Sequence, residues 1–272
     1  MMFIGEIGIN HNGNLDIAMD LIDIAYENGV DVVKFQKRTP ELCVPENEWD
    51  KVRETPWGTR SYIQYKNDIE FVAVEYDLID AYCKKLGIQW TASVWDVPSL
   101  EFIMQYDVPF IKIASACLTN KKLLRAINDT KMPVVMSTGM STFEEIEQAI
   151  NILESCDVSL LYCKSGYPTP NNEINLNGMV SLMEKYPCMK IGYSGHEIDI
   201  MPTMLAYTLG ANILERHITL DRNMWGTDQS ISLNPDLLQT LMDELNQIDS
   251  ILGCHDINVQ SCEIPAINKM RN

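Results

Sequence analysis

The feature that most constrains the fold of this chain is a regular alternation of short apolar runs with longer helical patterns. Eight runs rich in valine, isoleucine and aromatic residues recur along the 272 residues. They cover residues 3–9, 31–36, 88–94, 110–115, 133–138, 158–163, 189–194 and 213–218. Strands that alternate with helices form a parallel sheet, and eight strand–helix units close into a barrel. We therefore predict a single-domain α/β protein, a (β/α)8 or TIM barrel.

Helical patterns fill most of the intervals between these runs. Residues 15–25 repeat apolar side chains at helical spacing, and residues 234–252 close the series. Residues 141–155 open with Ser141 and, three positions later, Glu144, which is the pattern of a capping box. A doubly wound open sheet is the alternative arrangement, but no GxGxxG motif follows the first run. The closed barrel is therefore the favoured fold.

The domain organisation follows from where the pattern stops. We assign the barrel to residues 1–252 and a short C-terminal tail to residues 253–272. Residues 39–69 are too long and too polar for a simple connection. We interpret this segment as an elaborated loop after the second strand, on the catalytic side of the barrel, where it can act as a lid.

Composition and charge exclude several classes of protein. A formal net charge of −17 disfavours a nucleic-acid partner, because phosphates require a basic surface. No apolar run reaches the roughly 18 residues of a membrane helix, and the N-terminus lacks the pattern of a secretion signal. The eight cysteines contain no CxxC pair, which favours reduced thiols over disulfides. We therefore predict a cytoplasmic protein without a membrane or nucleic-acid partner.

Polar side chains end every predicted strand. Barrel enzymes place their chemistry at the C-terminal ends of the strands, whereas a purely structural barrel needs no charge there. The residues at these ends are Glu6, Asn10, Lys34, Gln36, Thr91, Ser93, Lys112, Ser115, Ser137, Thr138, Ser165, Ser194, His196, Glu215 and His217. We expect them to meet at one mouth of the barrel and to form the functional site.

Two histidines suggest a metal site. His196 and His217 follow adjacent strands, which lie about 4.8 Å apart in a sheet, so their imidazoles can share a divalent ion. Two hydrogen-bonded core histidines are the alternative. The carboxylates beside them in sequence, Glu197 and Glu215, favour the metal.

Two lysines suggest an anion site. Lys34 and Lys112 interrupt apolar strands, and a buried ammonium is costly unless it is paired. One explanation is an internal salt bridge with Glu6 or Glu215. The other is a shared phosphate or carboxylate ligand, with neutral hydrogen bonds from nearby hydroxyls. These hydroxyls belong to Thr91, Ser115, Ser137, Ser165 and Ser194.

At this point the chain resembles the sialic acid (N-acetylneuraminate) synthase family. The matching runs, in family order, are EIGINHNG (6–13), VVKFQ (32–36), FIKIAS (110–115), STGMST (137–142), SGYPTP (165–170), GYSGHE (192–197) and ERHITLDRNMWGTDQ (215–229). The resemblance implies an enzyme that condenses phosphoenolpyruvate with an aldose such as N-acetylmannosamine. The products are a 3-deoxy-2-keto sugar acid and phosphate, for the biosynthesis of sialic-acid-like sugars.

The resemblance also implies roles for individual residues. His196 and His217 hold a catalytic divalent metal, most often Mn2+, with Mg2+ or Co2+ as alternatives, and Glu6 lies near the aldehyde and the attacking water. Lys34, Thr91, Lys112, Ser115, Ser137, Ser165 and Ser194 bind phosphoenolpyruvate. Gln36, Tyr167, Glu215 and Asp228 orient the sugar and a water on the metal. The implied partners are these small molecules, and the chain can form a homo-oligomer.

Because the chain departs from the family pattern at several places, the resemblance does not specify which sugar it uses. Ala116 and Cys117 stand where the family has Gly-Glu, and we expect no antifreeze-like C-terminal domain after the barrel. We therefore expect the 39–69 segment to recognise the aldose, through Arg53, Trp57, Arg60 and Tyr62. Two alternatives remain: a metal-dependent barrel aldolase or isomerase that does not use phosphoenolpyruvate, and a catalytically silent sugar-binding paralogue.

Overall fold

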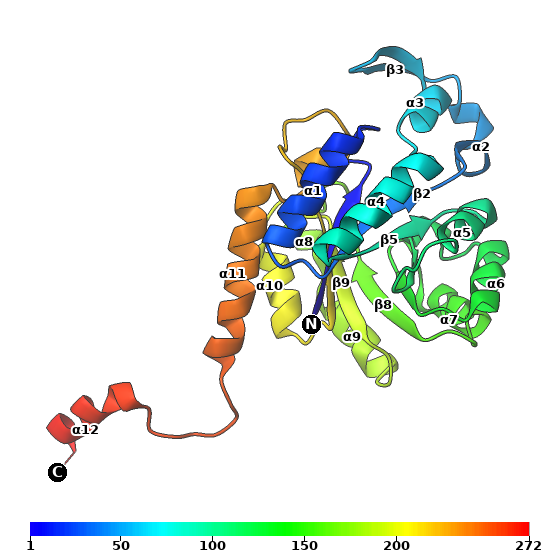
Figure 1. Cartoon of the computed structure of the whole chain (residues 1–272). Coiled ribbons are helices and arrows are strands. Elements are labelled where there is room, and N and C mark those ends of the chain that lie inside the picture. Colours follow the sequence, from blue (N-terminus) through cyan, green and yellow to red (C-terminus); the bar gives the residue numbers. More distant parts are fainter. Residues whose placement is uncertain (272) are drawn as a thin grey trace.

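The computed structural model describes residues 1–271, and its centre is a closed parallel barrel (Figure 1). Hydrogen-bonded neighbours follow the order β1-β10-β9-β8-β7-β6-β5-β2. The barrel strands are β1 (Met2–Gly8), β2 (Val32–Lys37), β5 (Gln89–Val94), β6 (Ile111–Ile113), β7 (Val134–Ser137), β8 (Val158–Cys163), β9 (Ile191–Gly195) and β10 (Ile213–His217). All eight predicted runs form these strands, so the TIM barrel is confirmed and the open sheet is wrong.

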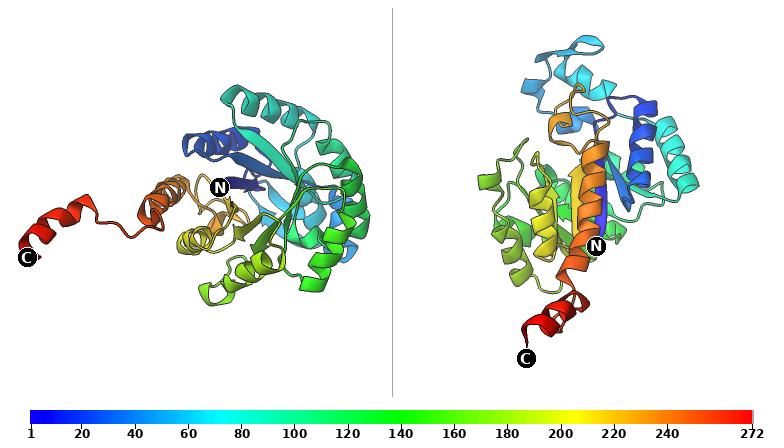
Figure 2. Two further views of the ribbon diagram at one scale, coloured as in Figure 1. Left: turned by 90° about the horizontal axis from the view of Figure 1, so that it is seen from below. Right: turned by 90° about the vertical axis from the view of Figure 1, so that its left-hand side faces the viewer.

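Helices form a ring around the strands, which is clearest when the barrel is seen end-on (Figure 2). The longer ones are α1 (Leu15–Glu27), α4 (Ala73–Leu86), α5 (Val97–Ile103), α6 (Lys121–Thr130), α7 (Phe143–Ile152), α9 (Asn177–Lys185), α10 (Met201–Thr208) and α11 (Pro235–Leu252). The first of them shows the common design. Asn14 caps α1 by accepting the backbone N–H of Asp16, and every buried residue of α1 lies on the stripe Ala18, Leu21, Ile22 and Ala25. These stripes and the outward faces of the strands form the main apolar core.

One helix start differs from the sequence prediction by a single residue. The capping box of α7 is formed by Thr142 and Glu145, not by Ser141 and Glu144. The hydroxyl of Ser141 instead donates to the carbonyl of Gly139, 3.2 Å away. Both pairs fit the capping pattern, and only the turn before the helix decides between them.

The barrel interior is layered, and this layering positions the polar residues. A plug of six apolar side chains fills the end near the strand N-termini. Its members are Ile4, Val32, Phe110, Val135, Leu161 and Ile213. Ile4 pairs with Val32 across β1 and β2, and two residues further on Glu6 pairs with Lys34. Since side chains alternate along a strand, Glu6 and Lys34 also point inward, one layer nearer the C-terminal ends.

Residues 39–69 form a small substructure at the C-terminal end of the barrel (Figure 1). It contains α2 (Pro40–Cys43), η1 (Glu46–Glu48), the antiparallel hairpin β3 (Val52–Thr55) and β4 (Gly58–Ser61), and α3 (Tyr62–Asp68). Trp225, in the loop after β10, lies 5.8 Å from the ring of Trp57 and 5.2 Å from that of Tyr65. The segment therefore lies on the predicted face and packs on a second loop there.

The chain beyond α11 leaves the barrel (Figures 1 and 2). Residues 253–263 are exposed, and η4 (Ser261–Glu263) and α12 (Ile264–Met270) extend into solvent. All eight cysteines are free, as the sequence predicts. None of the helices within residues 1–271 is long and apolar enough to cross a membrane.

Candidate active site

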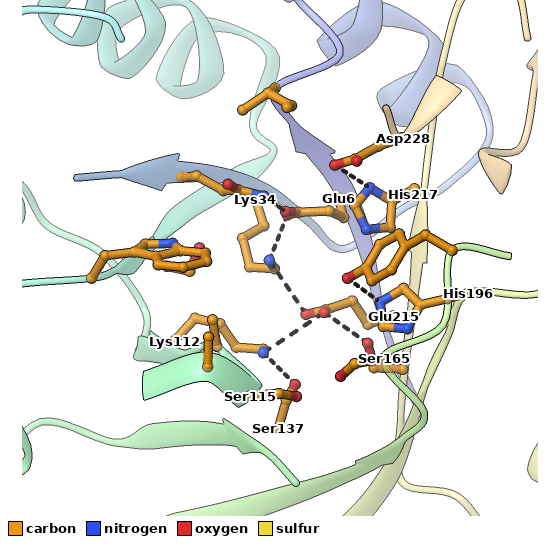
Figure 3. A pocket seen from close by; sticks show the side chains of 18 of the residues that line it. Glu6, Lys34, Lys112, Ser115, Ser137, Ser165, His196, Glu215, His217 and Asp228 are labelled. Atoms are coloured by element: carbon orange, nitrogen blue, oxygen red, sulfur yellow. Dashed lines mark hydrogen bonds and ion pairs between the residues drawn. The ribbon is translucent and has the colours of Figure 1, made fainter. Parts of the chain in front are cut away.

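A pocket of about 420 Å³ opens at the C-terminal end of the barrel (Figure 3). Side chains from all eight strands or the loops that follow them line it. Of the predicted site residues, the structure brings together Glu6, Lys34, Gln36, Lys112, Ser115, Ser137, Ser165, Tyr167, Ser194, His196, Glu215, His217 and Asp228. These residues come from positions 6 to 228, so the closed barrel is what collects them.

Three of the residues predicted at the strand ends do not line the pocket. Asn10 donates from Nδ2 to the carbonyl of Ile218 and to Ser232 Oγ, each at 2.8 Å, and the hydroxyl of Thr138 donates to the carbonyl of Leu161 at 3.1 Å.

Thr91 is fully buried, and its hydroxyl donates to the carbonyl of Phe110 at 2.7 Å. Ser93 lines the pocket in its place. In the register of β2 with β5, Thr91 lies beside Lys34 and Ser93 beside Gln36, so Ser93 is one inward step nearer the mouth.

Two carboxylates and two lysines form the floor of the pocket (Figure 3). Lys34 Nζ lies 2.5 Å from Glu6 Oε2 and 3.8 Å from Glu215 Oε2. Lys112 Nζ lies 3.7 Å from Glu215 Oε1, which also accepts a 3.0 Å hydrogen bond from Ser194. The charges of this floor cluster balance when both carboxylates are ionised. The internal salt bridge predicted for the lysines is therefore present, and the same ammonium groups face the pocket.

Burial and neighbouring charges set different proton affinities in the floor cluster. Burial raises the pKa of Glu6 from 4.5 to about 7, because Glu215 reinforces the effect and Lys34 only partly offsets it. Burial acts in the same direction on Glu215, but Lys112 and Lys34 outweigh it and its pKa is lowered. Burial lowers the pKa of Lys112. Glu6 is thus the carboxyl that exchanges a proton near neutral pH, whereas Glu215 stays ionised.

Hydroxyls form the side of the pocket next to Lys112. Ser137 Oγ lies 2.6 Å from Lys112 Nζ, and Ser115 Oγ accepts the backbone N–H of Gly139 at 3.0 Å. A Cβ at Gly139 would collide with the hydroxyls of Ser115 and Ser165, so glycine is needed for this close approach. An ammonium and several hydroxyls around one space are the groups that bind a phosphate or carboxylate.

The two histidines lie side by side, with ring centroids 5.6 Å apart. His196 Nδ1 donates to the carbonyl of Lys164 at 2.7 Å, which leaves Nε2 as the acceptor, 3.0 Å from the hydroxyl of Tyr167. Burial lowers the pKa of each histidine to about 4, so both are neutral at pH 7. His217 Nδ1 is buried without a hydrogen-bond partner in the described chain and lies 3.9 Å from Asp228 Oδ2.

Glu197, expected beside the histidines, faces away from the pocket. It is fully buried outside the barrel, where its Oε1 lies 2.9 Å from Arg216 Nη1 and its Oε2 accepts a 2.7 Å hydrogen bond from Tyr193. Thr203 donates a further hydrogen bond to Oε1. Glu197 and Arg216 adjoin His196 and His217 in sequence, so this buried ion pair fixes the backbone that carries both histidines.

The sequence analysis missed residues on one side of the pocket, which we call the outer wall: Arg38, Lys66, Trp95 and Thr227. Arg38 lies two residues beyond Gln36, just as Gln36 lies two residues beyond Lys34. The period-two alternation of the second strand therefore predicts that Arg38 also points inward. Lys66 belongs to α3 and had no such signal.

Ala116 also lines the pocket, whereas Cys117 is packed behind it with Sγ 3.9 Å from the carbonyl of Trp95. Of the two residues that stand where the family has Gly-Glu, only Ala116 therefore lines the pocket, and the departure from the family pattern changes the pocket at that position.

Comparison with known proteins identifies the family. The NeuB family matches residues 21–256. The chain belongs to the NeuB family. It is 37% identical to the N-acetylneuraminate-9-phosphate synthase of Drosophila melanogaster over 88% of this chain and 65% of that protein, just under two thirds of the relative's length.

Two further relatives are named for different activities. The chain is 34% identical to the human N-acetylneuraminate-9-phosphate synthase over 98% of this chain and 75% of that protein. It is 33% identical to the N,N'-diacetyllegionaminic acid synthase of Campylobacter jejuni over 93% and 77% of the two chains. The crystal structure of the sialic acid synthetase of Leptospira borgpetersenii, in complex with citrate, superimposes with a TM-score of 0.86 at 33% identity. That match covers 99% of this chain and 92% of the other.

Proposed function

We propose that this NeuB-family chain condenses phosphoenolpyruvate with an aldose and releases phosphate, giving a 3-deoxy-2-keto sugar acid. The observation that carries the proposal is the pocket itself: two buried lysines, a ring of hydroxyls and two neutral histidines open into one space. The named relatives make nonulosonic acids or their phosphates, which supports the same reaction class. These names include phosphorylated and unphosphorylated products, so the acceptor sugar is a separate question.

Phosphoenolpyruvate carries a carboxylate and a phosphate, and the floor of the pocket offers a partner for each. Lys34 and Lys112 are held in place by Glu6 and Glu215, so little side-chain freedom is lost on binding. Ser115, Ser137 and Ser194 add neutral hydrogen bonds that cost no further buried charge. We assign Ser165, whose hydroxyl lies beside Gly139, to the same group. In this assignment the methylene carbon of phosphoenolpyruvate faces the histidines.

The histidine pair fits a divalent metal. His196 lines the pocket, and its Nε2, which accepts the hydroxyl of Tyr167 here, would exchange that bond for the ion. His217 keeps a buried nitrogen without a hydrogen bond in the described chain. Within residues 1–271 no cluster of three or more His, Cys, Asp or Glu is arranged to hold a metal, so the protein would supply two nitrogens and leave positions open. We assign Mn2+ to this pair, with Mg2+ or Co2+ as alternatives, on the family resemblance, because two imidazoles alone do not select these ions. When bound, the ion would polarise the aldehyde as a Lewis acid.

Glu6 moves the protons in this mechanism. Its pKa of about 7 suits a group that both gives and takes a proton at neutral pH. The methylene carbon of phosphoenolpyruvate attacks the aldehyde carbon, whose oxygen gains a proton. Water then adds to the neighbouring carbon that carries the phosphate, losing a proton, and the C–O bond to phosphate breaks as the ketone forms. We assign one of these proton transfers to Glu6 and the orientation of the lysines to Glu215.

A direct assay tests the proposal. The purified chain with Mn2+ and phosphoenolpyruvate is expected to release phosphate only when an aldose is added, and to form a keto acid in equal amount. A panel should include N-acetylmannosamine, mannose and their 6-phosphates. Aldose turnover without phosphate release would instead indicate an aldolase or isomerase, and aldose binding without turnover a silent paralogue. A cytoplasmic location and a homo-oligomeric state remain predictions.

A further inference from the structure

Among the carboxylates that line the pocket, Asp228 is carried by a loop. Glu6 and Glu215 lie within β1 and β10, whereas Asp228 lies between β10 and α11. Its Oδ2 is 3.9 Å from His217 Nδ1, and Figure 3 shows the two side chains facing each other. A loop does not fix a side chain by a ladder of strand hydrogen bonds, so other contacts must hold Asp228 in this place.

A buried chain of hydrogen bonds holds the backbone of this loop. Asn10, two residues after β1, donates from Nδ2 to the hydroxyl of Ser232 at 2.8 Å. That hydroxyl donates in turn to the backbone carbonyl of Asp228 at 2.7 Å. Asn10 is 1% exposed and Ser232 is 0% exposed, so water does not compete for these bonds. We call the side chains of Asn10 and Ser232 the relay.

The direction of the hydrogen bonds in the relay is fixed. Asn10 Nδ2 carries two hydrogens and uses both, because it also donates to the carbonyl of Ile218 at 2.8 Å. A flipped amide would place Oδ1 against that carbonyl, and both atoms are acceptors. The hydroxyl of Ser232 therefore accepts from Asn10 and keeps its own hydrogen for Asp228. In this orientation Oδ1 of Asn10 is buried without a hydrogen-bond partner in residues 1–271, so the relay is formed in spite of one unpaired acceptor.

The residue after Asp228 is held by the same segment. Gln229 is 1% exposed, and its Nε2 donates to the backbone carbonyl of Asn10 at 3.1 Å. Its Oε1 accepts the hydroxyl of Thr219. The chain is therefore tied to the segment after β1 both at Asp228 and at the next residue, and β1 is the strand that carries Glu6.

We infer that Asn10 and Ser232 are positioning residues for the proposed reaction, and that they act on turnover through Asp228. The inference rests on the proposed function, with Asp228 in the orienting role that the family resemblance implies. Neither Asn10 nor Ser232 lines the pocket, so neither touches a substrate there. The relay instead keeps the carboxylate of Asp228 beside His217. A shift of about 1 Å in an orienting group can reduce a rate by about a hundredfold.

A double-mutant cycle tests whether the relay acts through Asp228. Phosphate release from phosphoenolpyruvate is measured, with the aldose that is turned over fastest, on the wild type, Ser232→Ala, Asp228→Ala and the double variant. Ser232→Ala removes one hydrogen bond to the loop and should lower kcat about five- to tenfold, with the KM for phosphoenolpyruvate unchanged. The double variant should lose no more than Asp228→Ala alone, because the relay then has no carboxylate to position.

Ser230→Ala is the matched control, because Ser230 lies in the same loop but is exposed. It should behave as the wild type. Asn10→Ala removes the preceding member of the relay and should give the same result in a cycle with Asp228→Ala, which provides a second test if Ser232→Ala folds poorly. The inference is overturned if the losses in kcat from Ser232→Ala and Asp228→Ala multiply in the double variant, since the hydroxyl would then support the barrel as a whole. It is also overturned if Ser232→Ala turns over as fast as Ser230→Ala.

Hydrogen exchange separates failure of the inference from failure of the proposed function, because it needs no substrate and no metal. Mass spectrometry follows the backbone amides of residues 224–233 in the full chain. Exchange should be about fivefold faster in Ser232→Ala than in the wild type and in Ser230→Ala. If no aldose yields product, the proposed function fails, and the exchange alone decides whether the relay holds the loop: unchanged exchange rejects the inference. Turnover with losses that multiply retains the proposed function and rejects the inference.

Discussion

The carboxylate of Glu215 lies 3.7 Å from the ammonium of Lys112 at the floor of the pocket. Glu215 also lies 3.8 Å from Lys34, so one carboxylate holds two ammonium groups that are themselves almost completely buried. Glu215 opposes the effect of burial at both ammonium groups: the pKa of Lys34 is raised, whereas that of Lys112 is still lowered by burial. An anionic substrate therefore meets charges that are already positioned.

The first prediction follows from this pair. Lys112→Met should raise the KM for phosphoenolpyruvate about ten- to hundredfold, the range expected for a buried charged hydrogen bond, and change the KM for the aldose much less. Lys34→Met should act in the same direction. Lys131→Met, at an exposed position, is the control. An equal rise for both substrates would show that Lys112 only supports the barrel.

The second prediction concerns the metal. His196→Ala and His217→Ala should each reduce turnover at least a thousandfold, about 4 kcal/mol of transition-state stabilisation, while circular dichroism stays unchanged. Both residues lie at strand ends, above the apolar plug, so the fold does not depend on them. Thermal shift with added Mn2+ gives a readout besides activity: the wild type should be stabilised and the variants should not. Stabilisation of all three proteins would place the ion elsewhere.

The third prediction concerns pH and Glu6. The native pKa of about 7 lies above the ordinary 4.5, so the native state binds more protons than the unfolded chain between these values. The stability contributed by Glu6 is fully present below this window and lost as the pH rises through it. The melting temperature of the wild type relative to Glu6→Gln should therefore fall between about pH 5 and about pH 8.

The histidines require this comparison between variants. Their pKa values are lowered from 6.5 to about 4, so the stability they contribute is present above 6.5 and lost as the pH falls, with the opposite sign to Glu6. Both proteins contain the two histidines, so the contribution of the histidines cancels in the difference in melting temperature between the wild type and Glu6→Gln. A difference in melting temperature that does not vary with pH would mean that Glu6 keeps an ordinary pKa.

Much of the site could be predicted from the sequence because it depends on local periodicity. Alternation along β2 places Lys34 and Gln36 on the inward face whatever the neighbouring strands do, and the ends of parallel strands meet at one mouth. The assignment of Thr91 rather than Ser93 to the substrate pocket was wrong. It depends on the register between β2 and β5, and the sequence of a single strand does not specify that register.

The outer wall could not be predicted for a different reason. Lys66 reaches the pocket only because α3 and the hairpin before it pack on Trp225, more than 150 positions later in the chain. No short-range pattern encodes such a contact. Glu197 was also misplaced, because its orientation depends on Arg216 of another strand.

The fourth prediction concerns this buried pair. Arg216→Met should lower the free energy of unfolding by about 3–5 kcal/mol, since it leaves the carboxylate of Glu197 buried without its main counter-charge. Adding Glu197→Gln should recover part of the loss by removing that charge. Chemical denaturation measures both, and Arg125→Met at an exposed position is the control. Loss of less than about 1 kcal/mol, as for a surface pair, would contradict a structural role for the pair.

The last prediction compares two arginines that face each other in the hairpin of β3 and β4. Arg53 pairs in register with Arg60, but the two point into different surroundings. Arg53 lies 4.3 Å above the ring of Tyr62 and lines a groove with Trp225 and Thr227, and Thr227 also lines the main pocket. Arg60 is bound to Asp68, with Nε 2.9 Å from Oδ2, and lines neither. Because Arg60 lines neither the groove nor the main pocket, the structure does not support its expected role in recognising the aldose. Arg53 is the better candidate.

Arg53→Ala should raise the KM for the aldose about two- to fivefold, the range of an exposed cation–π contact, and leave that for phosphoenolpyruvate unchanged. Arg60→Ala should change neither, because its ion pair with Asp68 is exposed and such pairs contribute little. The two variants remove the same side chain from paired positions of one hairpin, so any general loosening of the segment affects both. A larger effect of Arg60→Ala on the aldose would show that the hairpin moves on binding and brings Arg60 to the sugar.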